Sequence, residues 1–118
     1  MALSRIEEIF IYTDSLNDPI GTQEIHAWFD HSAIPHIKLN YNNAEQTQIV
    51  LDAVNTWWNY VDIDTLEEVN LPPVTAFPFV VYTEVHSNGP ISYLPRKYIQ
   101  GKDNIIAKLP GLYSLGRD

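Results

Sequence analysis

The sequence contains no cysteine, and its seven lysine and arginine residues are outnumbered by fifteen aspartate and glutamate residues. The absence of cysteine excludes disulfide bonds, thiolate catalysis and cysteine-ligated zinc, so the fold must be stabilised by packing alone. The formal charge of −8 argues against sequence-independent binding to nucleic acid, which depends on clustered basic residues. We therefore expect no redox chemistry at sulfur and no nucleic-acid partner.

Long hydrophobic runs are also missing. No stretch approaches the roughly 20 apolar residues needed to cross a bilayer, and the N-terminal M-A-L-S-R-I-E-E has no apolar stretch of signal-peptide length. We expect no membrane partner and a soluble, cytoplasmic protein. With 118 residues, 45% of them hydrophobic, the chain can bury one ordinary core, which predicts a single domain over residues 1–118.

Segments with strand and helix patterns alternate along the chain. Apolar runs and period-2 alternation predict strands near residues 6–12, 36–41, 79–85 and 91–94, the second of them at or near a sheet edge. Three- and four-residue spacing of apolar side chains predicts helices near residues 20–32, 44–60 and 103–109. Together they predict an α/β fold with a four-stranded mixed sheet flanked by helices.

Some details of these elements are also predicted. Trp57 and Trp58 would point about 100° apart on a helix, so one should fill the core while the other covers a loop or a partner. Residues 61–73 should form a connector, with a short helical turn at T-L-E-E-V. Asp103 should cap the last helix, and Pro110 should interrupt or end it.

The polar loop after the first strand ends in D-P-I-G, residues 18–21. Asp18 is a typical N-cap residue, and Pro19 suits the first helical position because its missing N–H would have no partner there. A carboxylate at this cap satisfies free amides, and we favour that role over a catalytic acid because no partner group is evident beside it. This junction is where we expect function, without a catalytic residue.

Four segments then occur in a fixed order: D-P-I-G, F-D-H-S-A-I-P-H-I-K-L-N-Y, T-A-F-P-F-V and I-Q-G-K-D-N-I-I-A-K-L-P-G-L. In order and spacing they resemble the glutaredoxin branch of the thioredoxin fold over nearly the whole chain. The resemblance implies that Asp18 and Gly21 stand where the family has the cysteines of Cys-Pro-x-Cys. It also implies a cis Phe77–Pro78 peptide bond and a first strand next to the third.

The resemblance further implies a ligand groove. The family binds glutathione or peptide along the backbone beside its cis-proline, and it holds a glutathione carboxylate at a Gly-Gly-x-Asp segment. This chain departs from the family pattern where Gln100 replaces a glycine, and where one extra residue separates Thr75 from Pro78. The implied groove residues are Asp18, Pro19, Thr75, Ala76, Phe77, Pro78, Gly101, Lys102 and Asp103.

The missing cysteines decide the expected activity. Thiol–disulfide exchange needs a thiolate that forms a mixed disulfide, so this reaction is excluded. We expect a redox-inactive binding or scaffold module whose partner is a small anion, such as glutathione, or an extended peptide or protein, and we expect no cofactor. The alternative is an enzyme of another class, a transferase-like user of glutathione or a similar small anion.

Three further groups of residues have simpler interpretations. His26, His31 and His36 are spaced by five residues and share no helical face, which favours surface histidines over a metal site. Ser15 has no nucleophile-elbow pattern around it, so we set hydrolysis aside. Positive charge is concentrated near the C-terminus, where we favour a solvated face over an anion-binding edge: Arg96, Lys97, Lys102 and Lys108.

Overall fold

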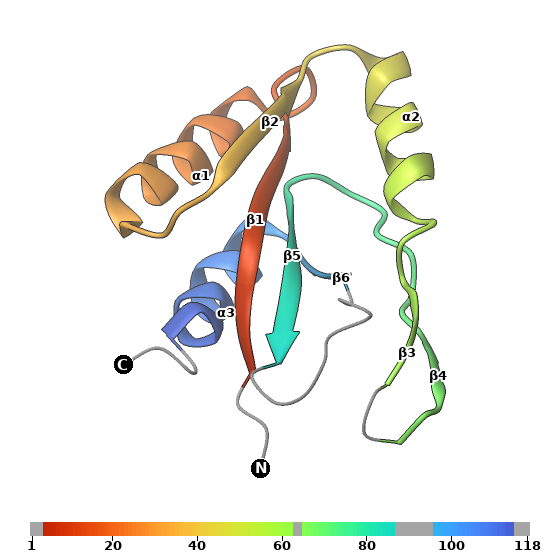
Figure 1. Ribbon diagram of the computed structural model, residues 1–118. Coiled ribbons are helices and arrows are strands. Elements are labelled where there is room, and N and C mark those ends of the chain that lie inside the picture. Colours follow the sequence, from red (N-terminus) through yellow and green to blue (C-terminus); the bar gives the residue numbers. More distant parts are fainter. Residues whose placement is uncertain (1–3, 63–64, 87–95, 115–118) are drawn as a thin grey trace.

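The computed structural model describes residues 4–62, 65–86 and 96–114, which form three helices and six strands (Figure 1). The helices are α1 (Pro19–Ser32), α2 (Ala44–Val54) and α3 (Lys102–Ser114). The strands are β1 (Ser4–Asp14), β2 (Ile37–Tyr41), β3 (Asn59–Val61), β4 (Glu68–Asn70), β5 (Phe79–His86) and β6 (Arg96–Gln100). Within these ranges, every helix is too short or too polar to cross a membrane.

Four strands form a mixed sheet in the order β2-β1-β5-β6. β1 runs parallel to β2 and antiparallel to β5, and β5 runs antiparallel to β6. The predicted α/β fold with a four-stranded mixed sheet is therefore confirmed, as are the edge position of β2 and the pairing of the first and third predicted strands. The Phe77–Pro78 peptide bond is cis, as predicted.

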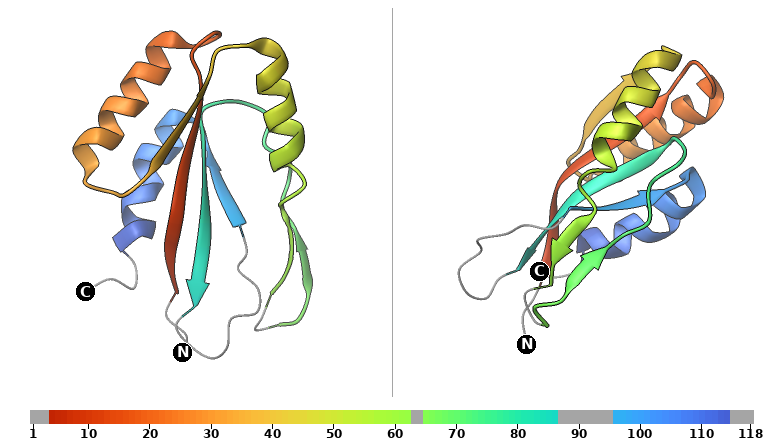
Figure 2. Two further views of the ribbon diagram at one scale, coloured as in Figure 1. Left: turned by 45° about the horizontal axis from the view of Figure 1, so that its top comes forward. Right: turned by 90° about the vertical axis from the view of Figure 1, so that its right-hand side faces the viewer.

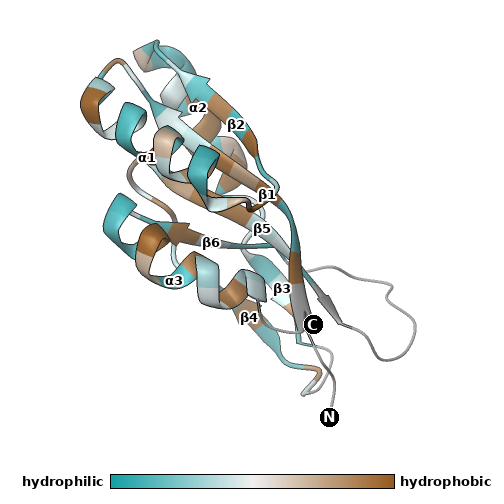
Figure 3. Ribbon diagram, turned by 90° about the vertical axis from the view of Figure 1, so that its left-hand side faces the viewer, coloured by the Kyte–Doolittle hydropathy of each residue, from teal (hydrophilic) through white to brown (hydrophobic). Residues whose placement is uncertain are grey.

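Helices α1 and α3 cover one face of the sheet (Figure 3). Burying each large apolar side chain here contributes about 1.5–3 kcal/mol, so this layer is a main source of stability. The buried side chains of this layer are Ile6, Ile9, Ile11, Ile25, Phe29, Ile34, Val80, Tyr82, Ile99, Ile105 and Leu109.

A β-bulge in β1 brings its apolar residues onto that face. Glu7 pairs with Thr83 and Phe10 pairs with Val81, so β1 has one residue more than β5 across this interval. Glu8 has a φ of 52°, a conformation that a bulge accommodates. Without the extra residue, Ile6 and Ile9 would point to opposite faces, because side chains alternate along a strand.

The opposite face of the sheet carries a second core, partly covered by α2 and the segment after it. The hairpin of β3 and β4 lies apart from the main sheet (Figure 2). The buried side chains of this second core are Tyr12, Val54, Trp58, Val74, Phe79 and Val81.

The second helix is shorter than predicted, because it ends at Val54 and not near residue 60. Asn55 follows it, and its Oδ1 accepts hydrogen bonds from Trp58 Nε1 (2.7 Å) and Val74 N (2.8 Å). These bonds hold a non-helical turn. The prediction that only one tryptophan is fully buried is confirmed, since Trp58 is 1% exposed and Trp57 is half-buried, but both lie after the helix.

The predicted connector contains a hairpin instead of a helical turn. Asn59 pairs with Asn70 and Val61 pairs with Glu68, so the end of T-L-E-E-V belongs to β4. The predicted strand over residues 91–94 lies outside the described residues. On the side of β5 away from β1, the pairing strand is β6, which covers residues for which the sequence predicted no element.

The last helix differs from the prediction at both ends. Asp103 lies within its first turn and not at the cap, since α3 begins at Lys102. Pro110 lies inside the helix, which continues to Ser114. A proline removes one helical hydrogen bond, yet the helix continues past it, and Leu112 and Tyr113 in its last turn pack against the first core.

Candidate functional site

The start of α1 has the predicted cap. Asp18 is exposed and its Oδ1 accepts a hydrogen bond from Gly21 N at 2.9 Å, and Pro19 occupies the first turn. This bond satisfies one of the amides that a helix N-terminus leaves free. The Asp18 side chain thus has a structural role.

A second carboxylate, which the sequence analysis did not single out, shapes the loop before this cap. Asp14 is 7% exposed at the end of β1, and its Oδ1 accepts from Leu16 N (3.0 Å) and Asn17 N (3.2 Å). Its Oδ2 accepts from Asn17 Nδ2 at 2.6 Å. An aspartate followed by S-L-N is typical of a turn closed by a side chain, and this signal could have identified it.

A pocket of about 290 Å³ lies beside the cap. It brings Asp18 together with Thr75, Ala76 and Phe77, four of the predicted groove residues. Asp14 and Asn17 line it from the loop, and Thr47 and Leu51 line it from α2. Two carboxylates therefore border this pocket, and its described lining contains no lysine, arginine or histidine.

The side chain of Gln100 occupies backbone donors of the predicted groove. Its Oε1 accepts from Thr75 N at 2.6 Å and from Ala76 N at 3.0 Å. Gly101, with a φ of +94° that favours glycine, donates from its N–H to the Pro78 carbonyl at 2.9 Å. The two halves of the predicted groove are adjacent, but these polar groups already bond each other.

The remaining predicted residues lie outside the described lining of the pocket: Pro19, Pro78, Gly101, Lys102 and Asp103. Lys102 forms an ion pair with Glu24 of α1. The hydrogen bond to Glu24 raises the pKa of Lys102, so this ammonium group stays charged and is already paired. A small anion would have to compete with Glu24 for it.

A chain of hydrogen bonds crosses the carboxyl ends of β1 and β2. His26 Nε2 lies 3.1 Å from Thr13 Oγ1, which donates to Asn40 Oδ1 at 3.0 Å. Asn40 Nδ2 donates to Ser15 Oγ (3.1 Å), which donates to the Tyr41 carbonyl (3.4 Å). Since the Thr13 hydroxyl donates its hydrogen to Asn40, its oxygen accepts a hydrogen bond from the His26 ring, whose Nε2 therefore carries a hydrogen.

This network bears on two of the weaker candidates. Among the described residues, Ser15 bonds to an amide and a carbonyl and to no histidine, which agrees with setting hydrolysis aside. Burial lowers the pKa of His26, and the nearby charge of Lys38 lowers it further. Among the residues that the structure describes, no cluster of histidine and acidic side chains could hold a metal ion.

Comparisons with protein-family models, with curated proteins and with solved structures find no match to this chain. The fold and the site define it as a cysteine-free α/β protein with a four-stranded mixed sheet. Its candidate site is an acidic pocket at the N-terminus of α1.

Proposed function

We propose that this chain is a redox-inactive protein of the glutaredoxin branch of the thioredoxin fold and that it acts as a binding module. The strand order and directions support this, because they place the predicted first and third strands side by side with a parallel edge strand. The packing of α1 and α3 on one face is consistent with it. Thiol exchange is excluded at Asp18 and Gly21 because neither carries sulfur.

The partner that we propose is an extended peptide or protein segment with a basic side chain, and not a small anion such as glutathione. The observation that carries this choice is the side chain of Gln100, whose Oε1 accepts from the amides of Thr75 and Ala76. An incoming carboxylate would have to displace it. The ammonium group of Lys102 is likewise occupied by its ion pair with Glu24, which an incoming carboxylate would also have to displace.

The charge of the pocket supports the same choice. The carboxylates of Asp14 and Asp18 border it, so an ammonium or guanidinium group would be attracted and a carboxylate repelled. Asp14 already accepts three hydrogen bonds. Asp18 accepts one and is exposed, so we assign the main contact with the basic group to Asp18.

The test is a titration of the ¹⁵N-labelled protein with two extended peptides that differ only in a central arginine or glutamate, and with glutathione. We expect amide shifts at residues 17–21 and 75–77 with the arginine peptide alone. Shifts with glutathione at residues 101–103 would instead favour the transferase-like alternative. No saturable shift with any of the three would contradict the proposed binding site.

Matched variants sharpen this experiment. Asp18→Asn keeps a capping side chain and removes the charge, so it should weaken binding of the arginine peptide. Asp52→Asn removes an exposed carboxylate on α2 that bonds Gln48 and does not line the pocket, and it should leave binding unchanged. Equal weakening by both variants would mean that only the net charge of the protein matters.

A further inference from the structure

A second pocket, of about 450 Å³, opens on the face of the sheet away from α1 and α3. It has no part in the proposed function. Phe10, Tyr12 and Val81 form its apolar floor on β1 and β5, and Trp57 forms a wall. Its volume is in the range of small-molecule sites, which are mostly apolar with a few polar groups.

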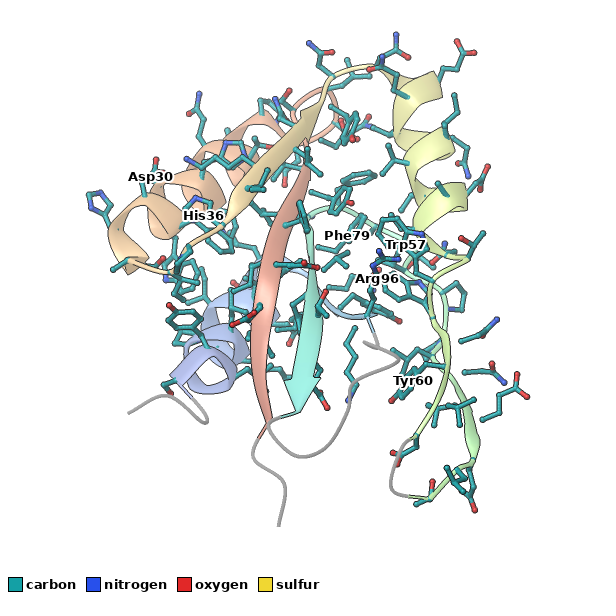
Figure 4. The ribbon with its side chains drawn as sticks, viewed as in Figure 1. Asp30, His36, Trp57, Tyr60, Phe79 and Arg96 are labelled. Atoms are coloured by element: carbon teal, nitrogen blue, oxygen red, sulfur yellow. The ribbon has the colours of Figure 1, made fainter. Side chains whose placement is uncertain are left out.

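Arg96 supplies the positive charge of this pocket. Its guanidinium lies 4.7 Å from the centre of the Trp57 ring (Figure 4), and this cation–π contact holds the side chain at the pocket wall. No carboxylate in the described part of the chain pairs with Arg96. A held but unpaired guanidinium beside an apolar floor is suited to a carboxylate, which it can bind through two parallel hydrogen bonds.

Glu8 supplies a negative charge on the other side of the same pocket. Its Oε2 accepts a hydrogen bond from Thr83 Oγ1 at 3.0 Å, and Thr83 pairs with Arg96 across β5 and β6. Glu8 and Arg96 therefore flank Thr83 on the two neighbouring strands, and the backbones of these two strands are about 10 Å apart by strand spacing. A ligand with its anionic group at Arg96 would have its far end near Glu8.

We propose that this pocket binds a small amphipathic monoanion. Its carboxylate bonds the Arg96 guanidinium, and its aromatic or branched apolar body lies on Phe10, Tyr12 and Val81 against Trp57. Glu8 determines the charge specificity, because a second negative group at the far end of the ligand would be repelled by its carboxylate.

The probes that test this are 4-phenylbutyrate, its neutral amide 4-phenylbutanamide and the dianion of 3-phenylglutarate, each titrated at pH 7. The signals of the Trp57 indole N–H and the Arg96 Nε–H report binding. We expect 4-phenylbutyrate to bind about tenfold or more tightly than the amide, because charge-assisted hydrogen bonds contribute on that scale. Equal binding of the acid and the amide, or no saturable binding of either, would overturn the proposal.

Two variants and a control complete the test. Arg96→Gln should remove the preference for the acid over the amide, whereas Lys108→Gln, which removes a cation on α3 outside the pocket, should preserve it. Glu8→Gln should tighten binding of 3-phenylglutarate more than that of 4-phenylbutyrate. An unchanged preference in Arg96→Gln would contradict the role of Arg96, and equal effects on both anions in Glu8→Gln would contradict the specificity assigned to Glu8.

Discussion

The carboxylate of Asp18 occupies the space that a side chain on Gly21 would need. A Cβ built on Gly21 would lie 2.1 Å from Asp18 Oδ2 and 2.6 Å from Asp18 Cγ. At the same time, Gly21 N donates to Asp18 Oδ1. The glycine is required here by the cap that folds over it, and this requirement should disappear when the carboxylate is removed.

This relationship predicts that the effect of Gly21→Ala changes sign with the residue at position 18. With Asp18 present, the alanine displaces the capping carboxylate, and we expect a loss of about 1 kcal/mol in the free energy of unfolding. In the background of Asp18→Ala, the same change should stabilise the protein by up to about 1 kcal/mol, because alanine is a better helix former than glycine. Urea unfolding of the four proteins of this cycle measures both effects. Additive changes would show that the two residues do not compete for space.

A second prediction concerns Asn55, which links the turn after α2 to the segment before β5. Its Oδ1 accepts from Trp58 Nε1 and Val74 N, and its Nδ2 donates to the Val74 carbonyl at 3.0 Å. Asn55→Ala would leave the indole N–H of a fully buried tryptophan without its partner. We expect a loss of about 2 kcal/mol or more in unfolding free energy.

The control for Asn55 is Gln48→Ala. Gln48 is exposed on α2, and within the described part of the chain its side chain bonds the side chain of Asp52, so its replacement should change stability by less than about 0.5 kcal/mol. Comparable losses in the two variants would mean that Asn55 does not hold the Trp58 turn.

The sequence predicted the elements whose signals are local. The cap at Asp18 and Pro19 follows from their residue types, and the start of β5 follows from the proline at position 78. The end of α2 could not be predicted from local signals alone, because one of the bonds that stabilise the turn joins Asn55 to Val74, 19 residues away.

The candidate site was predicted only in part for the same reason. The resemblance placed Asp18 and residues 75–77 in one groove, and they line one pocket. The bonds that fill the predicted anion site join Gln100 to Thr75 and Lys102 to Glu24, 25 and 78 residues apart. Neither pairing leaves a pattern in the local sequence, so neither could be predicted from it.

A third prediction concerns the pH dependence of stability. Burial lowers the pKa of His26 below its ordinary value of 6.5, so the unfolded chain takes up a proton at a higher pH than the folded protein does. The contribution of the neutral His26 to the free energy of unfolding is fully present above pH 6.5, and it is lost as the pH falls through the pKa of the folded state. We expect His26→Gln to flatten the dependence of unfolding free energy on pH between about 5 and 7.

The cause of the His26 shift can be tested separately. Lys38 is its second cause, so Lys38→Gln should raise the pKa of His26 toward 6.5 without restoring it fully. An NMR titration of the His26 ring in both proteins measures this. A His26 pKa at or above 6.5 in the unmodified protein would contradict the prediction.

The last prediction concerns the chemistry that the missing cysteines exclude. The unmodified protein should show no thiol-dependent reduction of a mixed disulfide, because it has no sulfur atom to carry the intermediate. The double variant Asp18→Cys, Gly21→Cys should fold, since removal of the Asp18 carboxylate frees the space above position 21. The N-terminus of α1 should lower the pKa of the new thiol at position 18 below about 8.5, which the pH dependence of its alkylation measures.

Glutathione-dependent turnover by this double variant should remain absent while Gln100 occupies the amides of Thr75 and Ala76. Adding Gln100→Gly introduces the glycine of the glutaredoxin pattern and frees both donors, so turnover should appear in the triple variant. Asn104→Ala is the matched control. Asn104 bonds the backbone carbonyl of Gln100, so its replacement should leave the Gln100 side chain on the two amides. Turnover in the double variant would show that Gln100 does not block glutathione. A folded triple variant with a low thiol pKa and no turnover would contradict the placement of a glutaredoxin-like groove at these residues, because the nucleophile and the backbone donors would both be present without the ligand being recognised.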